Sequence, residues 1–155
     1  MHSHAPDACQ CPYCLAVAGI ENEHVLTRQA DIFFRDEDIT AFIAAGGWPN
    51  NKGHVLIIPN AHYENLYGMP EPLLCRVHCF SRQVALALKQ VYRCDGVTIR
   101  QNNEPAGDQD VWHYHVHVLP RYAADDLHHT RREITPAPQR AGYAQRLREF
   151  FCPRS

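Results

Sequence analysis

A histidine at every second position of one short segment is the feature that most restricts how this chain folds. The segment reads Trp112-His113-Tyr114-His115-Val116-His117-Val118-Leu119-Pro120. Successive side chains of a β-strand point to opposite faces of the sheet. A strand here would place the side chains between the histidines on the core side, namely Trp112, Tyr114, Val116 and Val118. The segment therefore predicts a strand from Val111 to Pro120 with one face lined by histidines.

Three interpretations of this histidine face remain open. It is an exposed polar surface, a metal site with tetrahedral nitrogen and sulfur ligands, or a site where one histidine is a nucleophile and its neighbours set tautomer and charge. Each imidazole needs a hydrogen-bond partner or water, and it adds less apolar burial than a valine. This disfavours a purely structural role, but the spacing alone does not separate a metal site from a nucleophile.

The rest of the chain predicts an α+β fold. Apolar residues recur every three or four positions from about Glu71 to Tyr92, which is typical of a long helix. Further strands are expected at 32–35, 39–43, 54–59 and 97–100, a short helix near 15–20, a loop at 44–53, and a C-terminal helix in the tail 123–155. The prediction is one domain, residues 1–155, with a mostly antiparallel sheet of about five strands.

Composition excludes several classes of function. A net charge of -2 argues against a general nucleic-acid binder, whose surface would be basic. The longest apolar runs, such as Val55–Ile58, are too short to cross a membrane, and the first residues do not resemble a secretory signal. We therefore expect a cytoplasmic protein, in which the seven cysteines are reduced thiols or metal ligands. The pair Cys11 and Cys14 has the spacing of redox and metal motifs alike, but the thioredoxin-like context of a redox pair is absent.

Several blocks together resemble a known family. The run His113-x-His115-x-His117-x-x-Pro120 is similar to the signature of the histidine triad (HIT) family of nucleotide hydrolases and transferases. The segment 53–62, Gly-His-Val-Leu-Ile-Ile-Pro-Asn-Ala-His, resembles the second strand block of that family, and Gln101-Asn102-Asn103 with Gln109 resembles its phosphate loop. The order and spacing of these blocks agree from about Cys11 to Tyr122.

The resemblance implies a hydrolase that acts on a nucleoside phosphoramidate or a dinucleoside polyphosphate, with a nucleotidyl transferase as a close alternative. In the family, the middle histidine attacks the α-phosphorus and forms a nucleotidyl-histidine, and His115 matches that position. His117 matches the histidine that stabilises charge on the phosphate oxygens. The positions that match substrate-binding residues are Asn102, Gln109 and Asp110 in the loop before the histidines and His54 in the phosphate pocket.

The resemblance also implies a structural zinc ion and a homodimer. In the zinc-bearing, bacterial-type branch of the family, a Cys-x-x-Cys pair is joined by two histidines. The matching residues here are Cys11, Cys14, His62 and His113. A closed set of two cysteines and two histidines is structural, and it would pin residues 1–20 beside the histidine strand. Family members usually pair through the long helix and an adjacent strand.

Two positions depart from the family pattern. The acidic residue that binds the ribose hydroxyls in many members has no counterpart here, because the nearest positions are Ala44, Ala45 and Gly46. The serine that commonly precedes the triad is replaced by Asp110. An ionised carboxylate there would repel a phosphate. We expect Asp110 to turn towards a histidine or Arg121, to be protonated, or to face a cationic group of the substrate.

These departures leave two alternatives to a hydrolase. The first is a nucleotide-binding or regulatory module without turnover, which the missing ribose acid favours and the retention of all three histidines disfavours. The second is a metalloenzyme in which His113, His115 and His117 share an open metal site. The Cys11 and Cys14 pair argues against it, because that pair completes a separate four-ligand set.

Overall fold

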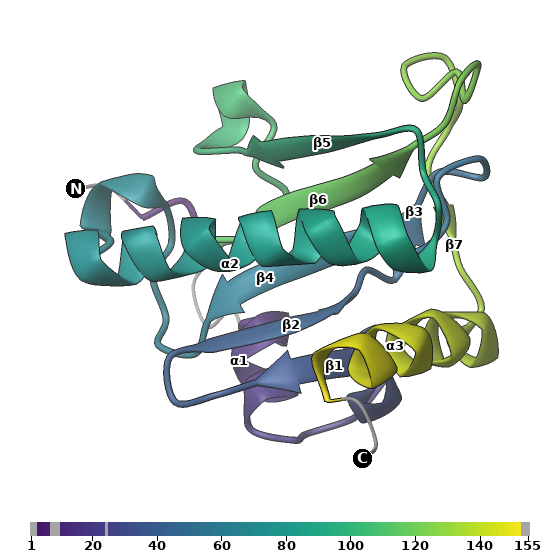
Figure 1. The fold of residues 1–155 in the computed structure, drawn as a ribbon. Helices are drawn as coiled ribbons and strands as arrows, with labels where there is room; N and C mark the ends of the chain where they lie inside the picture. The colour runs from purple at the N-terminus through teal and green to yellow at the C-terminus, as the bar shows by residue number, and fades with distance from the viewer. Residues whose placement is uncertain (1–2, 7–9, 24, 153–155) are drawn as a thin grey trace.

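The centre of the molecule is a five-stranded antiparallel sheet (Figure 1). The computed structural model describes residues 3–6, 10–23 and 25–152. In spatial order the strands are β1 (Ile32–Arg35), β2 (Ile39–Ile43), β4 (Val55–Pro59), β6 (Val116–Arg121) and β5 (Gly96–Gln101). Each neighbouring pair is antiparallel. The predicted fold class and sheet are therefore confirmed.

Helices cover both faces of this sheet. The long helix α2 (Glu71–Val91) and the C-terminal helix α3 (Ala137–Phe151) lie on one face (Figure 1). The short helix α1 (Pro12–Val17) packs on the other face through Tyr13. A proline in the first turn of each helix fits there because the first N–H groups of a helix have no partner within it.

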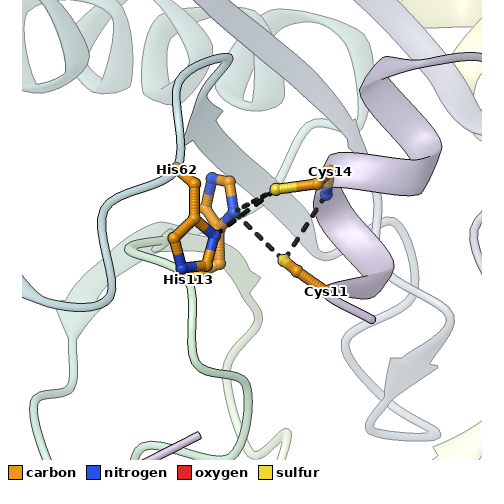
Figure 2. Close-up of side chains that lie close together, drawn as sticks. All are labelled: Cys11, Cys14, His62 and His113. Carbon is orange, nitrogen blue, oxygen red and sulfur yellow. Dashed lines mark hydrogen bonds between the residues drawn. The ribbon is translucent and has the colours of Figure 1, made fainter. Parts of the chain in front are cut away.

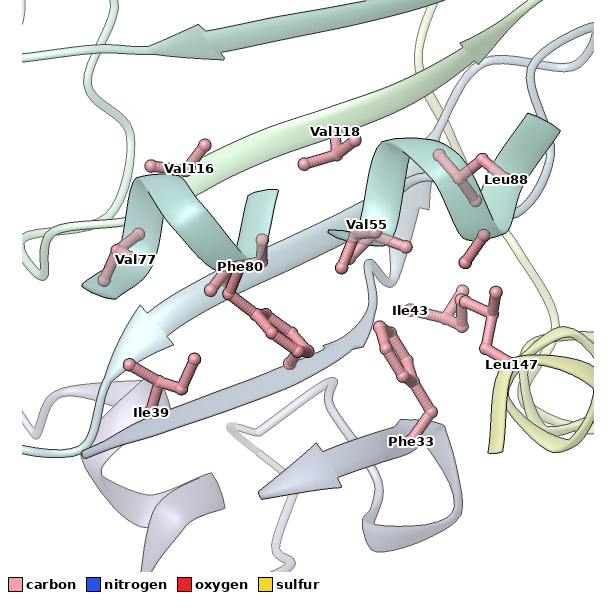
Figure 3. Close-up of a cluster of buried hydrophobic side chains, with 14 of the residues drawn as sticks. Phe33, Ile39, Ile43, Val55, Val77, Phe80, Leu88, Val116, Val118 and Leu147 are labelled. Carbon is pink, nitrogen blue, oxygen red and sulfur yellow. The ribbon is translucent and has the colours of Figure 1, made fainter. Parts of the chain in front are cut away.

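The main core lies between the sheet and the two longer helices (Figure 3). Val55 and Ile57 of β4 belong to this core, whereas Leu56 and Ile58 belong to the cluster around Tyr13 on the opposite face. All five residues of β4 are buried. This explains why β4 is continuously apolar, as the sequence predicted for a central strand.

The histidine strand begins later than its alternation predicts. β6 starts at Val116 rather than Val111, because Val116 is the first residue along the chain that pairs with β4 and β5. The segment before it is held by other contacts: the Tyr114 N–H donates to the carbonyl of Tyr63 at 2.5 Å. Tyr114 is buried as expected, but Trp112 is only partly buried and its ring stacks on His4. The expectation of a core position for Trp112 was wrong.

A second sheet has two strands, neither of which was predicted from the sequence. Strand β3 (Gly46–Gly47) lies in the predicted loop 44–53 and pairs with β7 (Glu133–Ile134) from the tail. Within the described residues there are also three 3-10 helices: η1 (Gln29–Asp31), η2 (Leu66–Gly68) and η3 (Pro105–Gly107). No helix in the described part of the chain has the length and apolar character needed to cross a membrane. Through the β3–β7 pairing, the tail lies close to the buried histidines described below.

Candidate functional site

The three alternating histidines are all buried, and they divide between two clusters. Their exposed fractions are 0% for His113, 1% for His115 and 4% for His117, so the interpretation as an exposed polar surface was wrong. The centres of the His115 and His117 rings lie 4.8 Å apart, and His54, immediately before β4, stacks on His117. His113 lies beside Cys11 and Cys14 instead.

Hydrogen bonds to backbone carbonyls define the tautomers of the first cluster. Nδ1 of His54 lies 3.2 Å from the carbonyl oxygen of Gly46, so this nitrogen carries the proton that it donates. Nε2 of His54 is then an acceptor for Nδ1 of His117, 2.9 Å away. It follows that Nε2 of His117 bears a lone pair.

The same reasoning applies to His115. Its Nδ1 donates to the carbonyl of His113 at 2.7 Å, which leaves a lone pair on Nε2. Burial lowers the pKa of His115, and burial followed by the neighbouring His54 lowers that of His117. Burial also lowers the pKa of His54 to about 3. All three imidazoles are therefore neutral near pH 7, and His115 has the form of a nucleophile.

Asp110 faces this nucleophile. Its Oδ1 lies 3.7 Å from Nε2 of His115, and its Oδ2 accepts a hydrogen bond from Nη1 of Arg132 at 2.9 Å. Asp110 thus lies towards a histidine, as one of the expectations had it. Arg121, the cation considered from the sequence, binds Asp125 instead. No sequence motif pointed to Arg132, which precedes β7 in the tail.

A cavity of about 240 Å³ adjoins the charged pair Asp110 and Arg132, which forms part of its wall. The remaining wall is mostly apolar and includes Tyr13, Leu26, Leu56 and Ile134. The positions where the family has its ribose-binding acid, Ala44 to Gly46, line it as well, and Thr27 adds a hydroxyl. The lining of the cavity suits an apolar group next to a charged one.

The two loop amides predicted to bind substrate hold the backbone of the loop. Asn102 donates from Nδ2 to the carbonyl of Asp108 at 2.9 Å. Gln109 accepts the Glu104 N–H at 2.8 Å and donates to the carbonyls of Glu64 and Val111. In this structure both side chains fix the conformation of the loop that leads into Asp110.

The second cluster brings together the four predicted metal ligands (Figure 2). Cys11 caps α1 and Cys14 lies in its first turn. His62 comes from the loop after β4, and His113 from the segment before β6. One ligand atom from each residue lies within 4.8 Å of the other three. Among the described residues, this is the one group of three or more histidine, cysteine or acidic side chains close enough to hold an ion.

The geometry of this cluster fits zinc. Nδ1 of His113 lies 3.2 Å from the sulfur of Cys11 and 3.6 Å from that of Cys14, and Nδ1 of His62 lies 3.4 Å from the Cys14 sulfur. The edges of a tetrahedral zinc site with these ligands are about 3.4 to 3.8 Å long. Nε2 of His113 is 2.9 Å from the carbonyl of Pro59, which leaves Nδ1 free to bind a metal.

Metal binding would change the charge state of the cluster. Burial, followed by the adjacent Cys11, raises the pKa of the Cys14 thiol to about 12. Two neighbouring thiolates in this position repel each other, and a divalent ion removes that cost. Burial lowers the pKa of His113 to about 4, so its imidazole is neutral as a ligand must be. The donor set is thus compatible with zinc.

Comparison with known proteins agrees with this geometry. A family model described as the HIT domain matches residues 26–124. The chain belongs to the histidine triad family. The family inferred from the sequence is therefore confirmed, and the HIT fold is that of nucleotide-binding hydrolases and transferases. Arg132 lies outside the matched residues.

Relatives occur in bacteria and archaea. An uncharacterised HIT-like protein of Methanocaldococcus jannaschii is 36% identical over 62% of this chain and 72% of its own. The Bacillus subtilis protein named hit is 31% identical over 75% of this chain and 74% of its own. The crystal structure of a zinc-bound histidine triad family protein from Mycobacterium smegmatis is 27% identical, covers 90% of this chain and 91% of its own, and gives a TM-score of 0.73.

Proposed function

We propose that this HIT protein hydrolyses a nucleoside phosphoramidate or a dinucleoside polyphosphate through a nucleotidyl-histidine on His115. The observation that carries the proposal is the state of this imidazole. Its Nδ1 is held by the His113 carbonyl, its Nε2 bears a lone pair, and burial keeps it neutral. A histidine fixed in this way is prepared for nucleophilic attack.

The reaction proceeds in two displacements at phosphorus. Nε2 of His115 forms a bond to the α-phosphorus while the bond to the leaving group breaks, and that group departs as an amine or a nucleotide. Water then attacks the same phosphorus and breaks the bond to Nε2, which releases a nucleoside monophosphate and the free imidazole. If another acceptor replaces water, the same intermediate supports nucleotidyl transfer.

His117 is proposed to bind the phosphate and His54 to position His117. In the tautomer described above, Nε2 of His117 is an acceptor, and the negative charge of an incoming phosphate favours its protonation. The ring takes this proton from solvent, donates it in a hydrogen bond to a phosphate oxygen, and then transfers it to the amine as the bond from phosphorus to nitrogen breaks. His54 keeps the other nitrogen of His117 in place. Asn102 and Gln109 keep the loop in the shape that presents Asp110.

A second candidate function is a nucleotide-binding module without turnover. Ala44 to Gly46 in the cavity wall favour it, because none of these side chains can accept a hydrogen bond from a ribose hydroxyl. A metalloenzyme that shares one ion between His113, His115 and His117 is disfavoured. Nδ1 of His113 lies beside the cysteines, whereas Nδ1 of His115 is hydrogen-bonded to a carbonyl.

Zinc in the Cys11, Cys14, His62 and His113 cluster is proposed to be structural. All four protein ligands together complete a tetrahedral shell, which leaves no position for substrate or water. The ion would join α1 to the segment that leads into β6 and so fix the N-terminal segment; residues 1–2 and 7–9 of that segment are outside the described residues. A cytoplasmic location stays a prediction.

A homodimer is proposed through α2 and β5. Strand β5 is at one edge of the main sheet, and its Ile99 is 45% exposed. Leu86 of α2 is 52% exposed. Large apolar side chains exposed next to an edge strand are typical of an interface. Light scattering after size exclusion should give twice the chain mass for the wild type and a lower mass for Leu86→Glu, whereas a monomeric wild type would refute the dimer.

Steady-state hydrolysis tests the proposed function. The zinc-loaded protein is incubated with adenosine phosphoramidate and, separately, with diadenosine tetraphosphate, and AMP is measured. We expect turnover by the wild type, loss of at least about a thousandfold in His115→Ala, and unchanged turnover in His128→Ala, a variant of an exposed histidine. Binding of AMP with no turnover of either substrate would support the binding module instead.

A further inference from the structure

The tail beyond β6 places a cation against Asp110, the carboxylate that faces the nucleophile. We propose that Arg132 is a phosphate-binding residue of this site, held ready by Asp110 and by Trp48. The inference rests on the proposed function, because it concerns how the same site binds its nucleotide. It assigns a role to a residue outside the part of the chain that the HIT model matches.

The position of Arg132 is fixed by the backbone on both sides. Glu133, the next residue, pairs with Gly47 in the small sheet. The side chain then runs over Gly46, where an added Cβ would lie 3.0 Å from Nη2. Gly46 is also the residue whose carbonyl binds His54. The guanidinium is thus directly beside the histidine cluster, and the absence of a side chain at Gly46 makes room for it.

The hydrogen-bonding capacity of Arg132 is mostly unused. A guanidinium has five N–H donors, and among the described residues its one hydrogen bond runs from Nη1 to Asp110. The side chain is 43% exposed, so a ligand can reach it. Arginine can donate two parallel hydrogen bonds to a phosphate group. Arg132 can therefore keep Asp110 and still bind phosphate oxygens through its other nitrogens.

Trp48 and Arg100 extend the same positive region. The guanidinium carbon of Arg132 lies 5.4 Å from the centre of the Trp48 ring, and that of Arg100 lies 4.9 Å from it. Such contacts hold cations in place over an aromatic ring. Nε of Arg100 is buried and has no hydrogen-bond partner among the described residues. Arg100 is opposite His117 in the sheet, so both cations flank the histidines.

The pairing of Asp110 with Arg132 explains how a carboxylate can lie beside a phosphate-binding site. A lone carboxylate 3.7 Å from the nucleophile would repel the substrate. Because Oδ2 of Asp110 is paired with Arg132, the charge of the carboxylate is compensated without a cationic group on the substrate. Arg100 adds a second guanidinium group beside the histidines, so a phosphate meets donors on two side chains. The structure therefore predicts that much of the affinity for a nucleotide comes from its phosphate.

Calorimetric titration of the zinc-loaded protein with AMP and with adenosine tests this inference. We expect Arg132→Gln to weaken AMP binding by about tenfold or more, since a hydrogen bond to a charged group is lost. Adenosine binding should change by less than about twofold, because adenosine has no phosphate for the guanidinium to bind. Arg132→Lys keeps the charge but cannot donate two parallel hydrogen bonds, so its AMP affinity should lie between those of the wild type and Arg132→Gln. Arg131→Gln is the matched control, because Arg131 is the exposed neighbouring residue, and it should change neither affinity.

A second pair of variants separates phosphate binding from mere compensation of Asp110. Arg132→Gln is compared in the wild type and in Asp110→Ser. The inference requires that the loss of AMP affinity persists in Asp110→Ser. It is overturned if the loss disappears there, if AMP and adenosine weaken equally, or if AMP binding is unchanged. Wild-type protein that binds AMP without turnover would refute the hydrolase alone, and wild-type protein that binds neither ligand would refute both.

Discussion

Replacement of His54 by alanine tests the link between the buried histidines and the proposed chemistry. His54 is 2% exposed, donates to the Gly46 carbonyl at 3.2 Å, and accepts from Nδ1 of His117 at 2.9 Å. In His54→Ala the Nδ1–H of His117 loses its acceptor. The proton is then free to move to Nε2, and the tautomer on which the site depends is no longer fixed.

The size of the effect follows from these contacts. A buried donor or acceptor left without a partner costs about 1–3 kcal/mol, and this variant creates one of each. Some of that cost is recovered where water enters the space left by the ring. We therefore expect a loss of about 2–5 kcal/mol in the free energy of unfolding. The exposed His128→Ala should stay within about 0.5 kcal/mol of the wild type.

Two measurements check the His54 prediction. Urea unfolding of zinc-loaded protein gives the change in stability, and nitrogen NMR of labelled histidine reports the tautomer of His117. We expect both to change, and nucleotide turnover to fall with them. A loss of stability below about 1 kcal/mol together with an unchanged His117 spectrum would refute the argument. The hydrogen bond from His117 to His54 would then determine neither the stability nor the tautomer.

Three further predictions concern the metal cluster, the tail and pH. Cys11→Ser should reduce bound zinc, measured by mass spectrometry of the metal, and lower the melting temperature; unchanged zinc content would contradict the ligand set. Arg140→Ala should cost about 3–5 kcal/mol in urea unfolding, because it leaves Asp31 buried without its counter-charge; a loss below about 1 kcal/mol would contradict this. A hydrogen bond from Arg121 holds the pKa of Asp125 well below its usual range. The wild type should therefore be more stable than Asp125→Asn above about pH 4, and this advantage should shrink as the pH falls below that value, the pKa of Asp in the unfolded chain. An advantage independent of pH would be inconsistent with this pairing.

The elements predicted correctly are those whose signal is local. The helix α2 repeats apolar residues with the helical period, and β4 is apolar throughout because it is buried on both faces. The start of β6 was misplaced for a physical reason. Alternation before Val116 reflects the two histidine clusters, which need His113 and His115 buried, rather than a ladder of strand hydrogen bonds.

The β3–β7 sheet and the position of Arg132 were not predicted from the sequence. Gly46 and Gly47 have no side chains to form a pattern, and β7 has only two residues, both exposed. Their pairing joins positions far apart in the chain, and no local signal encodes it. The signal that could have pointed to Arg132 is the substitution at Asp110, since a nearby cation compensates the charge of a carboxylate beside a phosphate site.

Intact-mass spectrometry tests the central claim most directly. Zinc-loaded wild type and His115→Ala are each mixed with adenosine phosphoramidate and quenched at short times, and the intact protein mass is measured. We predict a transient adenylyl adduct on the wild type, located to His115 by peptide mapping, and none on the variant. An equal adduct on His115→Ala, or AMP released by the wild type with no adduct at any time, would contradict a nucleotidyl-histidine on this residue.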